Sequence, residues 1–160
     1  MTRICRESII IYFTIGTAVA SDMPSHIENA KPSAYKIVVH AENSLDTLPL
    51  ETVRQYFLKK KTNWPSGQRV LPVDLHETSS LRELFSQQIL QRKVRSVRAY
   101  WQKNIFSGRA VPPPEKKSDA DVMSYIREHK NAIGYVSSNC VLSAELKVVQ
   151  VDPHEKKLDF

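Results

Sequence analysis

The residues best suited to hold a ligand lie in one short polar segment between an apolar run and a helical pattern. The hydroxyls of Thr78, Ser79 and Ser80 and the carboxylate of Glu77 come where a predicted strand ends and a helix begins. The first N–H groups of a helix have no intrahelical partner, and the helix dipole favours an anion beside them. Ligands of open α/β sheets also bind beyond the carboxyl ends of strands. This segment is therefore a candidate oxyanion site.

The same segment also has a purely structural interpretation. Ser80 and Glu83 have the spacing of a capping box, in which two side chains satisfy the helix start themselves. Glu83 would then repel a phosphate group. The spacing alone leaves both interpretations open.

The other polar residues form no recognisable metal or catalytic site. Asp74, His76 and Glu77 could offer oxygens and a nitrogen to a metal, but the five histidines lack metal-ligand spacing, which favours a polar loop. The sequence has no G-x-S-x-G or H-E-x-x-H motif. Cys140 has no base near it in the sequence, which indicates a free thiol in a loop. We therefore expect no enzyme activity, no metal and no cofactor.

The composition is that of a small, mildly basic domain. The chain has 160 residues, of which 41% are hydrophobic and 25% charged, and its net charge is +6. This hydrophobic content excludes wholesale disorder, and 4 glycines are too few for a glycine-rich phosphate loop. Basic clusters occur at 59–61 and 92–103. Because acidic residues are interleaved elsewhere, we interpret these clusters as solvated helix faces and expect no nucleic-acid partner.

The first twenty residues have the layout of a secretory signal peptide. Arg3 and Arg6 precede a short apolar run, and residues 18–20, Ala-Val-Ala, are small enough for a signal peptidase. Residues 21–34 then form a polar, flexible leader. We expect cleavage after Ala20 and a location in the periplasm or outside the cell, and the alternative is an uncleaved N-terminal anchor. No later apolar run approaches the roughly 18 residues of a membrane span, so none is expected after cleavage.

Strand and helix patterns alternate along residues 35–151, which we assign to one domain. Continuous apolar stretches predict strands, and Pro72 places one of them at a sheet edge or a strand end. Apolar residues at helical spacing predict the helices, with Ser80, Ser96 and Ser118 as caps. The predicted order is strand 35–40, helix 49–61, strand 70–73, helices beginning near 80, 96 and 118, strands 132–136 and 146–151, and a charged tail at 152–160.

Strands separated by helices indicate crossover connections. The sequence therefore predicts an α/β fold with a mainly parallel sheet flanked by helices. In the helix that begins near Ser80, the expected inward face consists of Leu81, Leu84, Phe85, Gln88 and Ile89.

Two segments carry a distinctive combination of residues. They are the turn 63–67, Asn-Trp-Pro-Ser-Gly, and the strand 132–136, Ala-Ile-Gly-Tyr-Val. Together with the strand 37–40, the helix end at 53–58 and the pair Tyr100-Trp101, they resemble the phosphate ABC transporter substrate-binding proteins. The resemblance covers residues 35–151. It implies one lobe of a type II periplasmic-binding-protein fold.

The resemblance also implies where a ligand would bind. The family's phosphate loop reads Arg-Ser-Asp-Gly-Ser-Gly-Thr before a helix. With Phe85 as the reference, the family's arginine falls at Leu75 and its threonine at Leu81. Its central serine falls at Ser79, which is identical, and its aspartate at Glu77, which is similar. Loss of the arginine removes a bidentate, charge-assisted phosphate contact.

Two functional hypotheses follow. In the first, the chain is an exported solute-binding protein linked to ABC-type phosphate uptake, which holds phosphate or another oxyanion weakly at Glu77, Thr78, Ser79 and Ser80, with Arg82 supplying charge. The family has two lobes and this chain is long enough for one, so a second copy or an envelope protein would supply the other wall. In the alternative, an envelope accessory or scaffold protein kept the lobe, lost the ligand and acts through protein–protein contacts.

Overall fold

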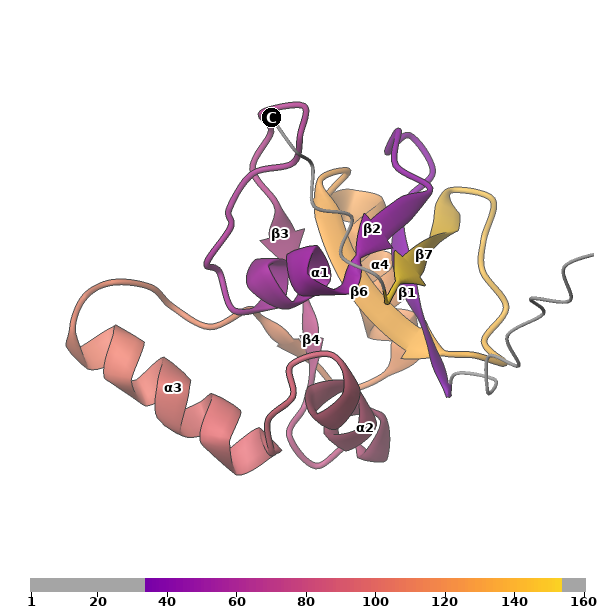
Figure 1. Cartoon of the computed structure of the whole chain (residues 1–160). Helices are drawn as coiled ribbons and strands as arrows, with labels where there is room; N and C mark the ends of the chain where they lie inside the picture. Colours follow the sequence, from indigo (N-terminus) through magenta and orange to yellow (C-terminus); the bar gives the residue numbers. More distant parts are fainter. Residues whose placement is uncertain (1–33, 154–160) are drawn as a thin grey trace, which may run out of the picture. The chain divides into compact units, whose positions relative to one another are not determined.

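The structure, a computed structural model, describes residues 34–153 (Figure 1). The predicted signal peptide, the leader residues 21–33 and the tail residues 154–160 lie outside the described residues. All described residues belong to one compact unit. Among them, no helix is both long enough and apolar enough to cross a bilayer.

A five-stranded sheet forms the centre of this unit, with the strand order β2-β7-β1-β6-β3. The strands are β1 (Tyr35–His40), β2 (Thr47–Pro49), β3 (Leu71–Pro72), β6 (Ala132–Ser137) and β7 (Leu146–Asp152). The short strands β2 and β3 pair in parallel with β7 and β6. The central strand β1 pairs antiparallel with both of its neighbours, β6 and β7.

Four strands thus run in one direction and β1 alone runs against them. The predicted α/β class is confirmed, and the predicted parallel arrangement holds for every strand except β1. Because β6 and β7 lie on opposite sides of β1 and point the same way, the loop 138–145 must return along the length of the sheet. Local sequence patterns specify strands but not their direction, which depends on such a connection.

A second, two-stranded sheet pairs β4 (Asp74–Leu75) with β5 (Glu115–Lys116) in parallel. The chain leaves the large sheet and joins the small one between two consecutive residues. The N–H of Val73 still donates to the Ile133 carbonyl of β6 at 2.9 Å, whereas the N–H of Asp74 donates to the Pro114 carbonyl at 3.0 Å. Pro72 lies in the edge strand β3, as expected, because it cannot donate to a neighbour.

Four helices complete the unit: α1 (Leu50–Phe57), α2 (Ser80–Gln88), α3 (Val94–Phe106) and α4 (Asp119–Glu128). The capping box of Ser118 and Asp121 at the start of α4 is confirmed. The other two predicted caps are wrong. Ser79 rather than Ser80 caps α2, and α3 begins after Lys93, three residues before Ser96.

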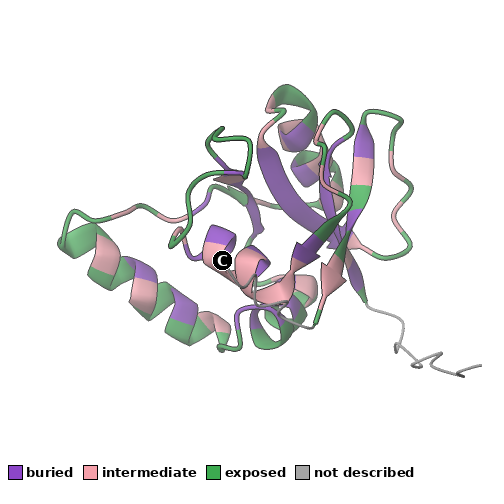
Figure 2. Ribbon diagram, turned by 45° about the horizontal axis from the view of Figure 1, so that its top comes forward, coloured by how far each residue is buried: buried purple, intermediate pink, exposed green. Residues whose placement is uncertain are grey.

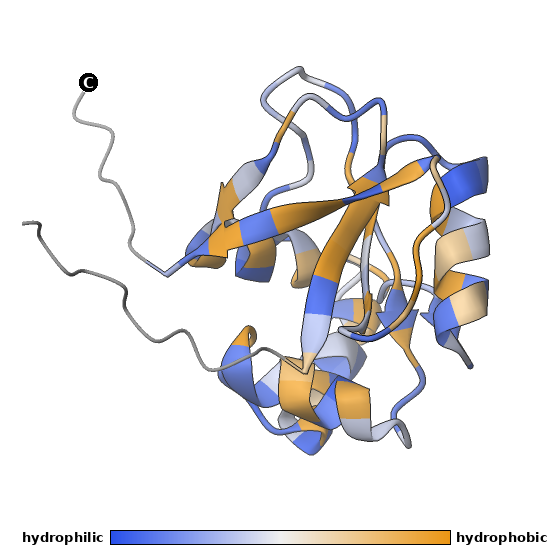
Figure 3. Ribbon diagram, turned by 90° about the vertical axis from the view of Figure 1, so that its right-hand side faces the viewer, coloured by the Kyte–Doolittle hydropathy of each residue, from blue (hydrophilic) through white to orange (hydrophobic). Residues whose placement is uncertain are grey.

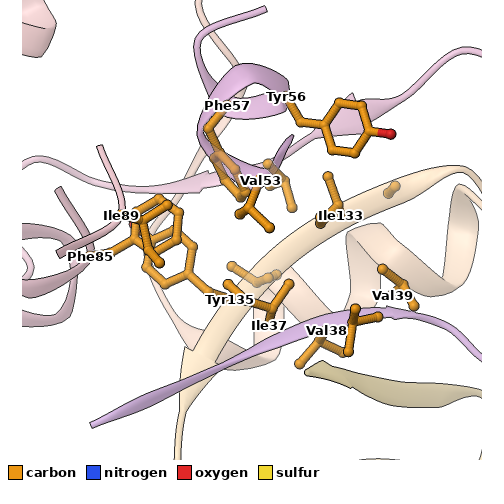
Figure 4. Packing of buried hydrophobic residues seen from close by; sticks show 14 of the residues in the cluster. Ile37, Val38, Val39, Val53, Tyr56, Phe57, Phe85, Ile89, Ile133 and Tyr135 are labelled. Atoms are coloured by element: carbon orange, nitrogen blue, oxygen red, sulfur yellow. The ribbon is translucent and has the colours of Figure 1, made fainter. Parts of the chain in front are cut away.

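Helices cover both faces of the large sheet. A Cβ at Gly134 of β6 would meet Val122 and Ile126 of α4, so this face of the strand is directed at α4. Tyr135, the next residue, faces the opposite way, and its ring lies against Phe85 of α2 and Phe57 of α1 (Figure 4). The Phe85 and Tyr135 rings stack with centroids 3.9 Å apart. β6 is buried along nearly its whole length (Figure 2), and hydrophobic residues concentrate along the strands (Figure 3).

The inward face of α2 differs from the predicted one. Its buried residues are Arg82, Phe85 and Ser86, while Leu84 is 37% exposed. The helix is therefore rotated relative to the face that its leucines predict. On this face Arg82 forms an ion pair with the buried Asp74, and the Phe85 ring stacks on Tyr135.

Candidate functional site

The loop 76–79 holds Glu77, Thr78 and Ser79, and the first turn of α2 holds the other two predicted residues, Ser80 and Arg82. The pairing of β4 with β5 fixes the first residue of the loop, because the N–H of His76 donates to the Lys116 carbonyl at 2.9 Å. The N–H of Ser79 then donates to the His76 carbonyl at 3.0 Å, which turns the chain into the helix. The first N–H groups of α2 therefore lie next to the loop.

The three hydroxyls of this segment have different surroundings. Thr78 Oγ1 lies 2.9 Å from His76 Nδ1, and Ser79 Oγ accepts a hydrogen bond of 3.5 Å from the backbone N–H of Arg82. A hydroxyl that accepts one hydrogen bond still has its own proton to donate. Ser80 is exposed, and its hydroxyl has no hydrogen bond within the described part of the chain. Ser79 and Ser80 thus keep a donor for a ligand.

A buried polar network lies directly beneath this loop. Arg82 and Asp74 are each 3% exposed and form an ion pair between Nη1 and Oδ2. The other carboxylate oxygen of Asp74 accepts hydrogen bonds from the Tyr135 hydroxyl at 2.6 Å and from the Leu75 N–H at 2.9 Å. The network fixes the Arg82 side chain from below.

Burial shifts the pKa values of two groups in this network. Removal from water lowers the pKa of Arg82, an effect that Tyr135 and Glu115 oppose. Burial also raises the pKa of Tyr135 to about 12, against the opposing field of Arg82. At neutral pH the tyrosine is therefore a neutral donor to Asp74.

Arg82 and Glu77 meet at a cavity of about 160 Å³ between the start of α2 and α3. Arg82 Nε is buried and has no hydrogen-bond partner among the described residues. Arg98 and Trp101 of α3 also line the cavity, and Arg98 Nη1 lies 3.4 Å from the Glu77 carboxylate. The structure therefore brings together two of the five predicted residues, whereas Thr78, Ser79 and Ser80 lie outside the lining.

Several residues of this site were not expected from the sequence. The sequence indicates Asp74 only as a possible metal ligand, and among the described residues no group of three His, Cys, Asp or Glu side chains could hold a metal ion. A carboxylate within the apolar run 70–75 is a signal that could have suggested a buried ion pair. No comparable signal marks Tyr135 or Arg98, which come from distant parts of the chain.

Comparisons with known proteins were made at the levels of sequence and structure. No model of a protein family matches the chain, and no curated protein matches it by sequence. A solved structure from Clostridium perfringens, assigned as a phosphate ABC transporter substrate-binding protein and containing bound phosphate, matches with a TM-score of 0.60 and 22% identity. The alignment covers 74% of this chain and 45% of that one.

Two further structures match in the same way. An ABC-type phosphate transport receptor from Vibrio cholerae has a TM-score of 0.58 and 19% identity, over 74% of this chain and 46% of its own. PstS from Borrelia burgdorferi has a TM-score of 0.56 and 11% identity, and the alignment covers 75% of this chain and 47% of PstS. The chain shares the fold of these substrate-binding proteins. It spans less than half of the length of each of them. The predicted resemblance to this family is confirmed at the level of the fold.

Proposed function

We propose that this chain is an exported, non-enzymatic solute-binding lobe that holds an oxyanion, in the first instance phosphate, at the start of α2. The fold supports a solute-binding role, since the matched protein from Clostridium perfringens contains bound phosphate. The observation that carries the proposal is the buried Arg82, whose Nε has no partner and which lines a cavity.

In this proposal an oxyanion enters the cavity and accepts a hydrogen bond from that unused donor, which requires the lining to open because Nε is closed to water in the free chain. A charge-assisted hydrogen bond in a buried setting is stronger than one between neutral groups in water. Asp74 and Tyr135 orient the guanidinium, while Ser79 and Ser80 are proposed as further donors from the loop. Glu77 and Glu115 reduce the positive potential at the cavity, so we expect weak affinity. A second copy or an envelope protein that covers the site would strengthen it, as part of ABC-type phosphate uptake.

Calorimetry of the full chain with inorganic phosphate tests the proposal. R82K keeps a positive charge for Asp74 but removes the planar guanidinium, so it should weaken phosphate binding about tenfold or more while the chain stays folded. S80A should weaken binding a few-fold, and S96A, which removes an exposed serine of α3, is its matched control. No heat at millimolar phosphate from a folded wild-type chain would reject the proposal.

A second candidate function is that of an envelope accessory or scaffold protein. Phe106 at the end of α3 is 90% exposed, and the nearby Val111 is 64% exposed. Exposed apolar groups of this kind commonly mark protein contacts. In this case F106S should abolish crosslinking to an envelope partner without a change in melting temperature. A strictly monomeric chain with no crosslinked partner in envelope extracts would reject this function.

A further inference from the structure

A second concave surface, unrelated to the loop before α2, lies beside the end of α1. It consists of two cavities of about 190 and 380 Å³ that adjoin, because Lys59, Thr62 and Arg69 line both of them. Lys61 lines the smaller cavity and Arg109 the larger one. We call this surface the basic groove. Among the described residues, none that is acidic lines either of its cavities.

The positive charges of the basic groove are not neutralised within the described part of the chain. Neither the two lysines nor the two arginines form an ion pair with a described carboxylate. Lys59 is half-buried, and its ammonium donates to the Pro112 carbonyl at 3.3 Å. Burial and the neighbouring charge of Arg69 lower the pKa of Lys59. The fold therefore holds like charges together where a bound anion would relieve their repulsion.

A buried tyrosine whose hydroxyl has no partner lies at the wall of this surface. Tyr56 is fully buried and lines the smaller cavity, and its hydroxyl has no hydrogen-bond partner among the described residues. In Figure 4 its ring points away from Val53 and Phe57, which pack into the core. The Lys61 ammonium lies 5.8 Å from the centre of the same ring. Burial raises the pKa of Tyr56, so the hydroxyl is a neutral donor at physiological pH.

We infer that the basic groove binds a small phosphorylated anion with two or more negative charges, of the pyrophosphate class. Four cations around two joined cavities suit several phosphate oxygens, and arginine recognises them with paired donors. The combined space is in the range of small-molecule sites. Because the cations line cavities, a compact ligand fits better than a nucleic-acid backbone or a flat membrane. The groove shares no charged residue with the cavity at Arg82, so this inference extends beyond the proposed function.

Calorimetry of the full chain with inorganic pyrophosphate at low ionic strength tests the inference. K59Q and R69Q should each weaken binding about tenfold or more, as expected for loss of a hydrogen bond to a charged group. K60Q is the matched control, because Lys60 is adjacent in sequence and exposed but lines neither cavity. Its effect should stay below about twofold. An equal loss of pyrophosphate affinity in K59Q and K60Q would mean that pyrophosphate is attracted by the overall charge and not bound in the groove, which would overturn the inference.

Y56F separates binding from folding. Loss of a buried, unpartnered hydroxyl should leave the melting temperature of the free chain unchanged or raise it, while it weakens pyrophosphate binding several-fold. R82K should leave pyrophosphate binding at the groove unchanged, because Arg82 lines neither of its cavities. A failure of this inference can therefore be distinguished from a failure of the proposed function. Saturable binding to vesicles that contain phosphatidic acid, lost in R69Q, without any binding of free pyrophosphate would contradict a small-anion site.

Discussion

At the scale of single residues, the ion pair of Asp74 and Arg82 determines how α2 lies on the sheet. Both side chains are almost fully buried, and Tyr135 adds a hydrogen bond to the same carboxylate. A buried pair of this kind is costly to desolvate and adds little net stability, but the loss of one partner leaves an uncompensated charge. The pair therefore specifies an orientation more than it stabilises the fold.

This asymmetry predicts the behaviour of Asp74 variants in urea denaturation. D74A should lower the free energy of unfolding by about 3–5 kcal/mol, because the Arg82 guanidinium remains buried without its partner. The double variant D74L/R82M removes both charges and should recover a large part of that loss. A D74A variant within about 1 kcal/mol of wild type would show that Arg82 reaches water, contrary to its burial.

Tyr135 predicts a loss of stability at alkaline pH. Its pKa is about 12 in the folded chain and about 10 in the unfolded one, so between these values the unfolded state binds fewer protons. Stability is then fully present below pH 10 and falls as the pH rises toward 12, by at most about 3 kcal/mol from this residue. Tyr35, with a pKa of about 12 for the same reason, adds to the slope.

Urea denaturation at several pH values between 10 and 12 measures that slope. Y135F should make the fall with pH shallower, whatever the loss of its hydrogen bond does to stability at neutral pH. An unchanged slope in Y135F would contradict the assignment of the titration to this residue.

Residue-scale predictions from the sequence succeeded where the interaction is local. Ser118 and Asp121 are three residues apart, and their capping box needs no other part of the chain. At the start of α2 two adjacent serines could each cap the helix. The spacing of Ser80 and Glu83 predicts Ser80, whereas Ser79 is the cap. The inward position of Arg82 was not predicted, since apolar spacing cannot indicate a buried ion pair.

At the scale of elements, the strands and helices with strong local patterns were predicted, and those defined by their partners were not. The ranges of β1, β6 and β7 and the start of α1 follow from continuous or periodic apolar residues, whereas α1 ends at Phe57, before the lysines 59–61 that were predicted to end it. The short strand β5 exists only because β4 pairs with it. The reversed direction of β1 likewise depends on how distant segments meet.

The close approach of α4 to β6 depends on Gly134. A Cβ at this position would lie 2.8 Å from Cγ1 of both Val122 and Val73. G134A should therefore destabilise the chain by about 1–3 kcal/mol in urea denaturation, because the core has no room for the added methyl group. The double variant V122A/G134A should lose less than the sum of the two single variants. Strict additivity would contradict a contact between these two positions.

The cap of α4 offers a second test at this scale. S118A should cost about 1 kcal/mol of stability, because it removes the hydroxyl that accepts the Asp121 N–H. S96A is the matched control: Ser96 was predicted as a cap, but α3 begins at Val94. Its effect on the melting temperature should be near zero, and a loss equal to that of S118A would mean that α3 begins later than the structure shows.

At the scale of the whole molecule, the described unit shares its fold with the matched phosphate substrate-binding proteins and carries two concave surfaces that we propose as anion sites. One surrounds the buried Arg82, where Arg82 is paired with Asp74 and Arg98 with Glu77, and Glu115 adds a further carboxylate. The other, the basic groove, has four cations and no acidic lining residue. The sequence indicated the first through its loop between strand and helix, but it could not indicate the second, whose residues join only in the folded chain.

Amide chemical shifts of the labelled full chain during a titration with inorganic phosphate test the central claim most directly. Phosphate binding at the start of α2 should give saturable shifts concentrated at the amides of Ser79, Ser80 and Leu81 and at Arg82 Nε. The R82K variant should lose them with its other resonances intact. Absence of saturable shifts at this loop, or shifts confined to Lys59 and Arg69, would contradict phosphate binding at the start of α2.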